Sequence, residues 1–144
     1  MLRSMNDIFL GNRNNFIMKL PSLLAAHFRQ VNFGGNWTWV NLKETLKDIT
    51  WEQATTKLDS LNTIAMLAYH INYYVVAITK VLQGNPMEAH DKYSFDCPPI
   101  QNEEDWEKMK EKIFAEAETL AGLIEHTHYH LGQIVIIKKL LAHR

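Results

Sequence analysis

Cysteine is almost missing from this chain of 144 residues, which contains only Cys97. A single cysteine excludes an intramolecular disulfide and is typical of proteins from a reducing compartment. Neither a helix N-terminus nor a basic side chain accompanies Cys97 in the sequence, so we do not expect it to be a nucleophile.

An excess of charge of one sign is also lacking. The chain carries 15 basic and 16 acidic residues, which gives a net charge of −1 and no general attraction to nucleic acids or anionic membranes. Residues 1–15 lack the apolar core of a signal peptide, and no apolar run approaches the length of a membrane-spanning helix. We therefore expect a cytoplasmic protein without a nucleic-acid or membrane partner.

Strand-like alternation, internal repeats and a glycine-rich phosphate loop are absent from the sequence, whereas helical spacing recurs. The pattern predicts helices over residues 20–31, 63–83 and 103–143, with short helices after Asn41 and Thr50. Asn62 is the predicted N-cap of the second long helix, and Asn102 that of the third. The sequence predicts an all-α fold, a four-helix bundle formed by residues 1–144 as one domain. Residues 85–101 form a long irregular connection after the second bundle helix.

Three side chains of the first forty residues are predicted to pack inward. His27 lies on the apolar face of the first helix and is expected to be a core or boundary histidine with a backbone partner. Trp37 and Trp39 are expected to pack against the bundle, because large aromatic side chains dominate protein cores.

Histidine is concentrated near the C-terminus, in the segment EHTHYHLGQIVIIKK of residues 125–139. His126 and His130 lie one helical turn apart on one face, where two imidazoles can share a divalent metal ion. The alternative is a pair of polar surface histidines. His70 lies at the edge of the apolar stripe of the helix over residues 63–83 and needs a polar partner, either a metal or a backbone carbonyl.

The segment HTHYHLGQIVIIKK, with His70 in YHINYY, resembles the DinB/YfiT-like superfamily of metal-binding four-helix bundles. The stretches NWTWVNLKETLKDITWEQA, NTIAMLAYHINYYV and DKYSFDCPPI are similar to one bacterial DinB-like subgroup. The resemblance implies a three-histidine site formed by His70, His126 and His130, with zinc or nickel as the usual metal. Some relatives transfer low-molecular-weight thiols, one related group isomerises maleylpyruvate with a thiol cofactor, and many have no known activity.

The implied function is a divalent-metal-dependent enzyme, a thiol S-transferase or a hydrolase, acting on a small molecule with a low-molecular-weight thiol as possible co-substrate. The alternative is a non-catalytic metal-binding or structural helical bundle. Three imidazoles without an acidic ligand leave a divalent ion electrophilic. Thr127 stands where an HExxH peptidase has its glutamate base, which argues against peptide hydrolysis of that style. Gln133, one turn after His130, either orients His130 or a bound water, or serves helix packing.

The connection over residues 85–101 is expected to cover the metal end of the bundle, anchored by Tyr93, Phe95 and Ile100. Polar side chains in this connection are candidates for a pocket rim or are simply solvated, namely His90, Asp91, Tyr93 and Asp96.

Residues 103–143 lack the connection that relatives carry between the third and fourth bundle helices, and two outcomes are open. The chain turns near Gly122, or one helix about 60 Å long runs through and brings the histidine pair to a partner chain. The stripe of Trp106, Ile113 and Leu120 is rotated by about 100° from that of His130, Ile137 and Leu141, which favours a break. We expect a break near Gly122 and a homodimer in either case.

Overall fold

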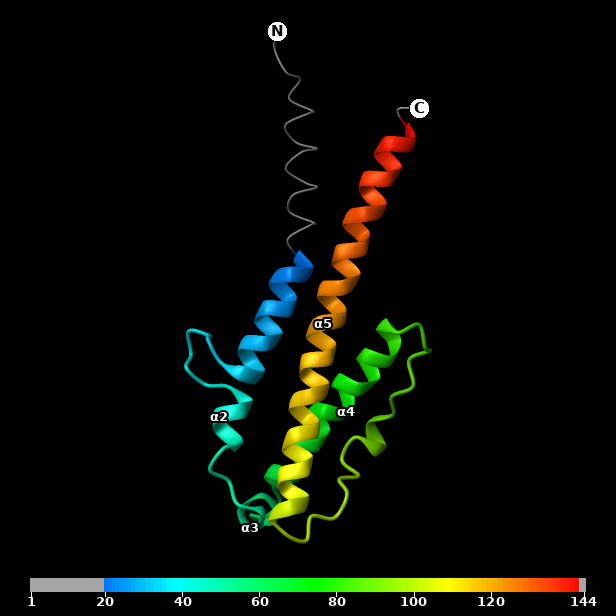
Figure 1. Ribbon diagram of the computed structural model, residues 1–144. Helices are drawn as coiled ribbons and strands as arrows, with labels where there is room; N and C mark the ends of the chain where they lie inside the picture. The colour runs from blue at the N-terminus through cyan, green and yellow to red at the C-terminus, as the bar shows by residue number, and fades with distance from the viewer. Residues whose placement is uncertain (1–19, 143–144) are drawn as a thin grey trace.

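The computed structural model describes residues 20–142, apart from the side chains of 127–129, 131–132 and 139–142. Helices, turns and irregular segments make up this described range and no strand occurs in it, so the predicted all-α class is confirmed. A helix over residues 20–33 precedes α2 (Leu42–Leu46), α3 (Trp51–Thr55), α4 (Ile64–Leu82), the short 3-10 helix η1 (Asp91–Tyr93) and α5 (Glu103–Ala142). Figure 1 shows helix 20–33 and α4 on either side of α5, with α3 at the end where α5 begins.

The two short helices begin at side-chain caps, as predicted. Asn41 accepts a hydrogen bond from the backbone N–H of Glu44 at 3.0 Å, which satisfies one free donor at the start of α2. Thr50 and Gln53 form a reciprocal capping box at the start of α3. These caps need only residues three apart in the chain, which is why the sequence reveals them.

The cap of α4 lies one residue later than predicted. Thr63, not Asn62, accepts from the N–H of Met66 at 3.2 Å, because its side-chain oxygen is three residues before that donor. The helix ends before Gly84, whose φ of 91° suits a residue without a side chain. By length and composition alone, α4 is long and apolar enough to cross a membrane, contrary to our expectation from the sequence. The core helix of a soluble protein meets the same two criteria.

The core lies where α3, α4 and the first part of α5 meet. Trp106 is fully buried, and its indole Nε1 donates to the carbonyl of Ile49 at 2.8 Å. This hydrogen bond joins the start of α5 to the segment between α2 and α3, and it satisfies the one polar atom of the ring. The other buried members of this cluster are Leu46, Ala54, Ala65, Ala68 and Ile113.

Helix 20–33 is held against the middle of α5 by charge and by aromatic packing. The Arg29 guanidinium pairs with Glu118 at 3.2 Å and with Glu125 at 2.6 Å. Near the other end of the contact, the rings of Phe33 and Phe114 have centroids 5.8 Å apart. The contact therefore runs along α5 from Phe114 to Glu125.

The expected inward packing of three early side chains is wrong. Trp37 and Trp39 are 89% and 90% exposed, and His27 is exposed as well. Both tryptophans lie in the turn between helix 20–33 and α2, which Asn36 closes with bonds to Gln30 O at 3.0 Å and Val40 O at 2.7 Å. This turn directs them away from the core.

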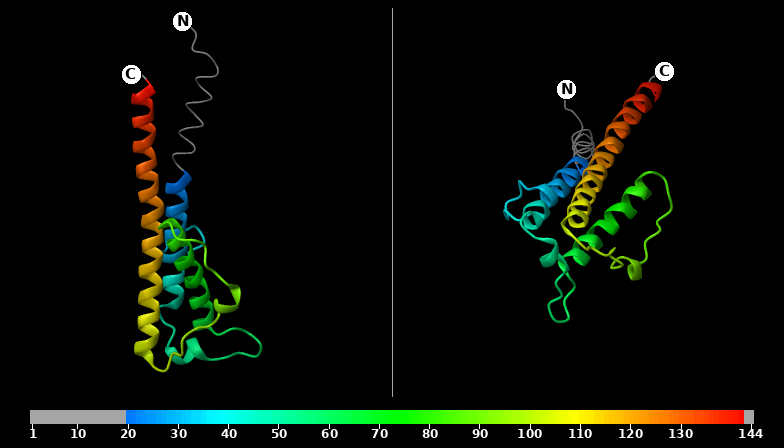
Figure 2. Two further views of the ribbon diagram at one scale, coloured as in Figure 1. Left: turned by 90° about the vertical axis from the view of Figure 1, so that its right-hand side faces the viewer. Right: turned by 60° about the horizontal axis from the view of Figure 1, so that its bottom comes forward.

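The expected break near Gly122 is also wrong, because α5 is one helix of 40 residues that passes through this position. At 1.5 Å per residue such a helix is about 60 Å long. No proline interrupts residues 103–142, and one internal glycine costs a helix only about 1 kcal/mol. No capping side chain precedes Leu123 to begin a new helix. Figures 1 and 2 show that the second half of α5 extends past the end of α4. The predicted fourth bundle helix is thus the far half of α5.

Candidate metal centre

Two of the three predicted ligands lie side by side on α5. The Nε2 atoms of His126 and His130 are 3.1 Å apart, and the rings meet at 83° with centroids separated by 4.4 Å. Two nitrogens bound to one tetrahedral zinc ion at about 2.0–2.1 Å are about 3.3 Å apart. The pair therefore has nearly the separation that a shared ion requires, and both side chains are exposed to an incoming ion.

Gln133 fixes the proton on one of these rings. Its Oε1 lies 2.8 Å from Nδ1 of His130. An amide oxygen only accepts hydrogen bonds, so Nδ1 of His130 carries the proton and Nε2 presents a lone pair toward His126. Of the roles left open by the sequence, orientation of His130 is the one that this contact performs.

The ring of His70, like that of His130, donates from Nδ1 to a side-chain oxygen. Its Nδ1 lies 2.9 Å from Oγ of Ser94, and the Ser94 hydroxyl donates to the carbonyl of Asp91 at 2.6 Å. Because the single hydroxyl proton is used there, Nδ1 of His70 is the donor and Nε2 holds the lone pair. This is the tautomer that binds a metal through Nε2, although the sequence predicted only a metal or a backbone carbonyl as the partner.

Aromatic rings hold the His70 imidazole in place. Phe95 stacks on it with centroids 4.0 Å apart, and Tyr74 meets it edge-on at 5.3 Å. Ser94 is completely buried beneath this group. The ring therefore has a fixed direction, and the side chain that fixes its proton lies in the connection rather than in a helix.

The connection between α4 and α5 does lie against His70, as we expected. The phenol of Tyr74 donates to Asp91 at 2.9 Å, and the hydroxyl of Tyr73 accepts from the backbone N–H of His90 at 2.9 Å. The hydrogen bond to the Asp91 carboxylate raises the pKa of Tyr74 above its ordinary value. His90 and Asp91 therefore attach the connection to α4.

The three histidines do not meet within one chain. Among the residues that the structure describes, no group of three or more His, Cys, Asp or Glu side chains is close enough to hold a metal ion. The pair on α5 lies in the half that extends past α4, whereas His70 is on α4 itself. A single copy therefore has two of the predicted ligands in one place and the third in another.

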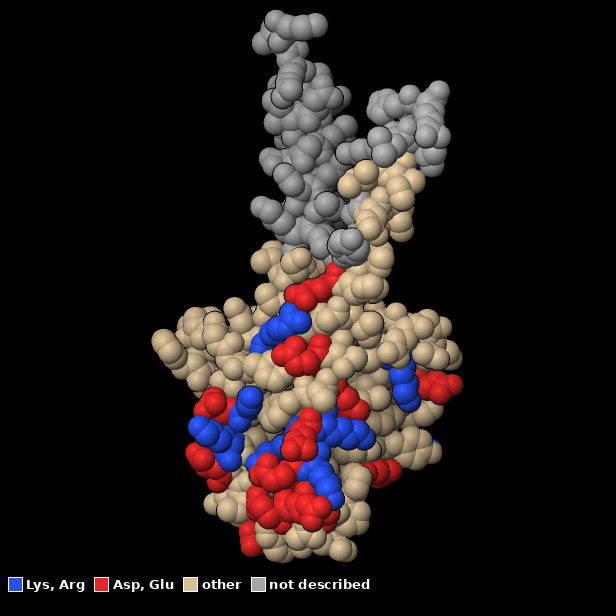
Figure 3. All heavy atoms as spheres, viewed as in Figure 1, with Lys and Arg blue, Asp and Glu red and all other residues tan. Residues whose placement is uncertain are grey.

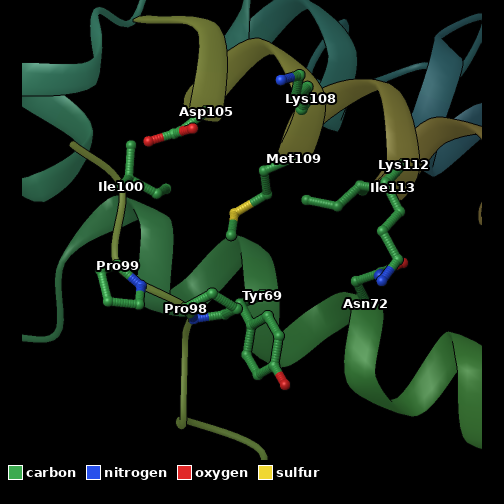
Figure 4. A pocket seen from close by; sticks show the side chains of 10 residues that line it. All are labelled: Tyr69, Asn72, Pro98, Pro99, Ile100, Asp105, Lys108, Met109, Lys112 and Ile113. Atoms are coloured by element: carbon green, nitrogen blue, oxygen red, sulfur yellow. The ribbon is translucent and has the colours of Figure 1, made fainter. Parts of the chain in front are cut away.

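A separate cavity of about 270 Å³ lies between α4, α5 and the connection, and no histidine lines it. Figure 4 shows Tyr69 and Asn72 of α4 facing Met109 and Ile113 of α5 across it. Asn72 donates to Glu116, but its buried Oδ1 has no partner within the described part of the chain. A polar residue at this position on an apolar helix was a visible sequence signal that our prediction did not use.

Cys97 lies at the edge of the core. Its Sγ is 3.7 Å from the carbonyl of Ala65. Burial raises the pKa of the thiol, because an apolar environment disfavours the thiolate. That Cys97 is not a nucleophile stays a prediction, and the raised pKa lowers the thiolate fraction on which nucleophilic attack depends.

Comparison with known proteins adds no identification. No family model, no curated protein and no solved structure matches the chain. The resemblance to the DinB/YfiT-like superfamily therefore stays a prediction from the sequence, based on the histidine segment, the surroundings of His70 and the other quoted stretches.

Proposed function

We propose that this protein binds one divalent metal ion, zinc or nickel, through Nε2 of His70, His126 and His130. The observation that carries the proposal is the contact that Nδ1 of His70 and Nδ1 of His130 each make with an oxygen, at 2.9 Å and 2.8 Å. In the neutral imidazole such a contact leaves the lone pair on Nε2. Metal-binding histidines characteristically donate their second nitrogen to such an oxygen.

The ligand set supports an enzyme activity of the thiol S-transferase or hydrolase type. An ion held by three neutral imidazoles is a Lewis acid with an open position, which lowers the pKa of a thiol or of water. The residues of this chain position the imidazoles. Gln133 orients His130, while Ser94 and Phe95 orient His70.

A non-catalytic metal-binding module is the second candidate. It is favoured because, among the described residues, no aspartate or glutamate is grouped with the histidine pair closely enough to share an ion with it. General acid–base catalysis needs such a group within hydrogen-bond reach of the substrate. The two candidates share the same metal site and differ only in turnover.

Metal content tests the ligand assignment. We expect one zinc or nickel ion per chain after loading and desalting, measured by plasma mass spectrometry. His126→Ala should reduce this content sharply. His128→Ala is the matched control, because it removes another histidine of the same segment and residues two apart in a helix do not share a face. Equal metal content in the two variants would refute the assignment.

Turnover separates the two candidates. Loss of an electrophilic small molecule that requires both a thiol and the metal, and that stops on addition of a chelator, would establish the enzyme. No turnover by metal-loaded protein across panels of thiols, esters and amides would favour the binding module.

A further inference from the structure

The two halves of α5 have different environments. In the first half, one stripe is buried against the chain itself: Trp106 is 0% exposed, Ile113 2% and Leu120 4%. Burial stops after Ala121, and the described side chains beyond Ile124 are exposed except for one intermediate residue. His126, His130, Ile134 and Ile137 follow each other at helical spacing on one face, and the two isoleucines are 60% and 55% exposed. We call these four residues the distal stripe.

A second apolar face is left uncovered on α4, and His70 lies at its border. Residues at spacings of four, seven and four share this face and are 42–47% exposed, namely Leu67, Ile71, Ile78 and Leu82. Helix 20–33, on the other side of α5, also exposes apolar residues, namely Leu20, Leu23, Leu24 and Val31. Helix 20–33 and α4, one on each side of α5, therefore both expose apolar side chains that a further apolar helix packed beside α5 would cover.

We propose that a second copy of the chain fills this position by exchange of helices. In the resulting two-fold dimer, the distal stripe of each copy lies on α4 of the other, and the partner's His126 and His130 join His70. The metal part of this inference rests on the proposed function, because it uses the same three ligands. Each site is incomplete without the partner chain.

A continuous helix makes this contact impossible within one copy. The distal half of α5, about 20 residues and therefore about 30 Å long, points away from α4 and has no turn by which to fold back. Each copy thus has one apolar stripe and one apolar acceptor face that cannot meet each other. A two-fold axis joins both pairs at once, which is the self-complementarity of an isologous dimer.

In such a dimer the histidines of the two copies lie at the same height along α5. We place the two-fold axis of the dimer at Gly122, where burial of α5 by its own chain ends. Antiparallel α5 helices then put the partner's His130, eight residues after Gly122, beside Phe114, eight residues before it.

His70 lies at this level too. Its neighbour Tyr69 lines a cavity that extends along α5 from Asp105 to Ile113, and Asn72 bonds Glu116. The level of His70 along α5 therefore falls within residues 105–116, a span that includes Phe114 and so the level of the partner's His130.

Charge supports the same antiparallel arrangement. The first turn of α5 carries Glu103, Glu104 and Asp105, and Figure 3 shows acidic side chains gathered at that end of the molecule. The exposed Lys138 lies sixteen residues after Gly122, so the partner's Lys138 falls beside Trp106, next to this acidic turn. A parallel pair would instead place the acidic turns together, where like charges repel.

Oligomeric state tests the helix exchange without reference to metal. Light scattering at micromolar concentration should give a dimer for the wild-type chain and a monomer for Ile137→Asp, which places a charge in the proposed interface. Ile136→Asp is the matched control, because Ile136 is 60% exposed and Ile137 55%, but Ile136 points about 100° away from Ile137 of the distal stripe. A monomeric wild type, or equal behaviour of the two variants, would overturn the exchange.

Complementation tests the shared site. His70→Ala and the double variant His126→Ala/His130→Ala should each bind little metal alone. Refolded together, they should recover about a quarter of the wild-type metal content, because half of the dimers are mixed and each mixed dimer has one intact site of two. No recovery, with metal-binding wild type, would overturn the shared site and leave the proposed function standing. A wild type that binds no metal would instead refute the proposed function.

Discussion

Nδ1 of His70 lies 2.9 Å from Oγ of Ser94, a buried residue of the irregular connection that is 24 positions away in the sequence. Since the Ser94 hydroxyl donates to Asp91, it can only accept from the imidazole. In the neutral imidazole this contact places the proton on Nδ1 and the lone pair on Nε2, so the orientation of His70 depends on the position of the connection.

Ser94→Ala removes the acceptor for Nδ1 of His70 and should weaken metal binding by about 10- to 100-fold, the usual effect of losing such a supporting partner. Competition with a coloured chelator measures the affinity. Thr119→Ala is the control, because that hydroxyl bonds only to the carbonyl of Ala115 in its own helix. Undiminished affinity in Ser94→Ala would contradict the assigned role of Ser94.

A flexible joint at Gly122 should convert the dimer into a monomer that keeps its metal. Inserting about six glycine and serine residues after Gly122 lets residues 123–142 fold back, since antiparallel helices need only short loops. Light scattering and metal content measure the result. The same insertion in the exposed turn at Asp59 and Ser60 should leave the dimer intact. An inserted chain that remains dimeric would count against the exchange.

Trp106→Phe should lower the free energy of unfolding by about 1–3 kcal/mol. The substitution leaves the carbonyl of Ile49, which accepts from the indole at 2.8 Å, without its donor. Trp37→Phe should change stability by less than about 0.5 kcal/mol, because Trp37 is 89% exposed. Urea unfolding followed by circular dichroism compares the two variants. Similar losses in both would be inconsistent with the different burial of these residues.

Cys97 should react slowly with iodoacetamide at pH 8. Burial raises the pKa of its thiol, so the thiolate fraction at a given pH is smaller than in an unfolded chain. The reaction rate should increase as the pH rises above the ordinary pKa range of a thiol. Unfolding the protein in urea should increase the rate immediately. Mass spectrometry of the alkylated protein follows the reaction. A folded protein that reacts as fast as the denatured one would contradict the assigned burial.

The sequence by itself determined the features that depend on neighbours a few residues apart. Asn41 and Thr50 cap their helices, and Gly84 follows the end of α4, because capping involves residues within one turn. The pairing of His126 with His130 followed from the four-residue repeat of the helix in the same way. The cap of α4 was misplaced by one residue because Asn62 and Thr63 can both perform the role.

Only the tertiary structure decided which surfaces are covered. Trp37 and Trp39 have the composition of core residues, yet the turn that carries them faces solvent. The rotation between the two stripes of α5 was visible in the sequence. This rotation predicted a break in the helix near Gly122 only on the assumption that one chain covers both stripes. In the structure the helix continues through Gly122, because a single glycine costs less than an uncapped helix end, and the distal stripe stays exposed. Ser94 became the partner of His70 through the path of an irregular connection, which no local rule specifies.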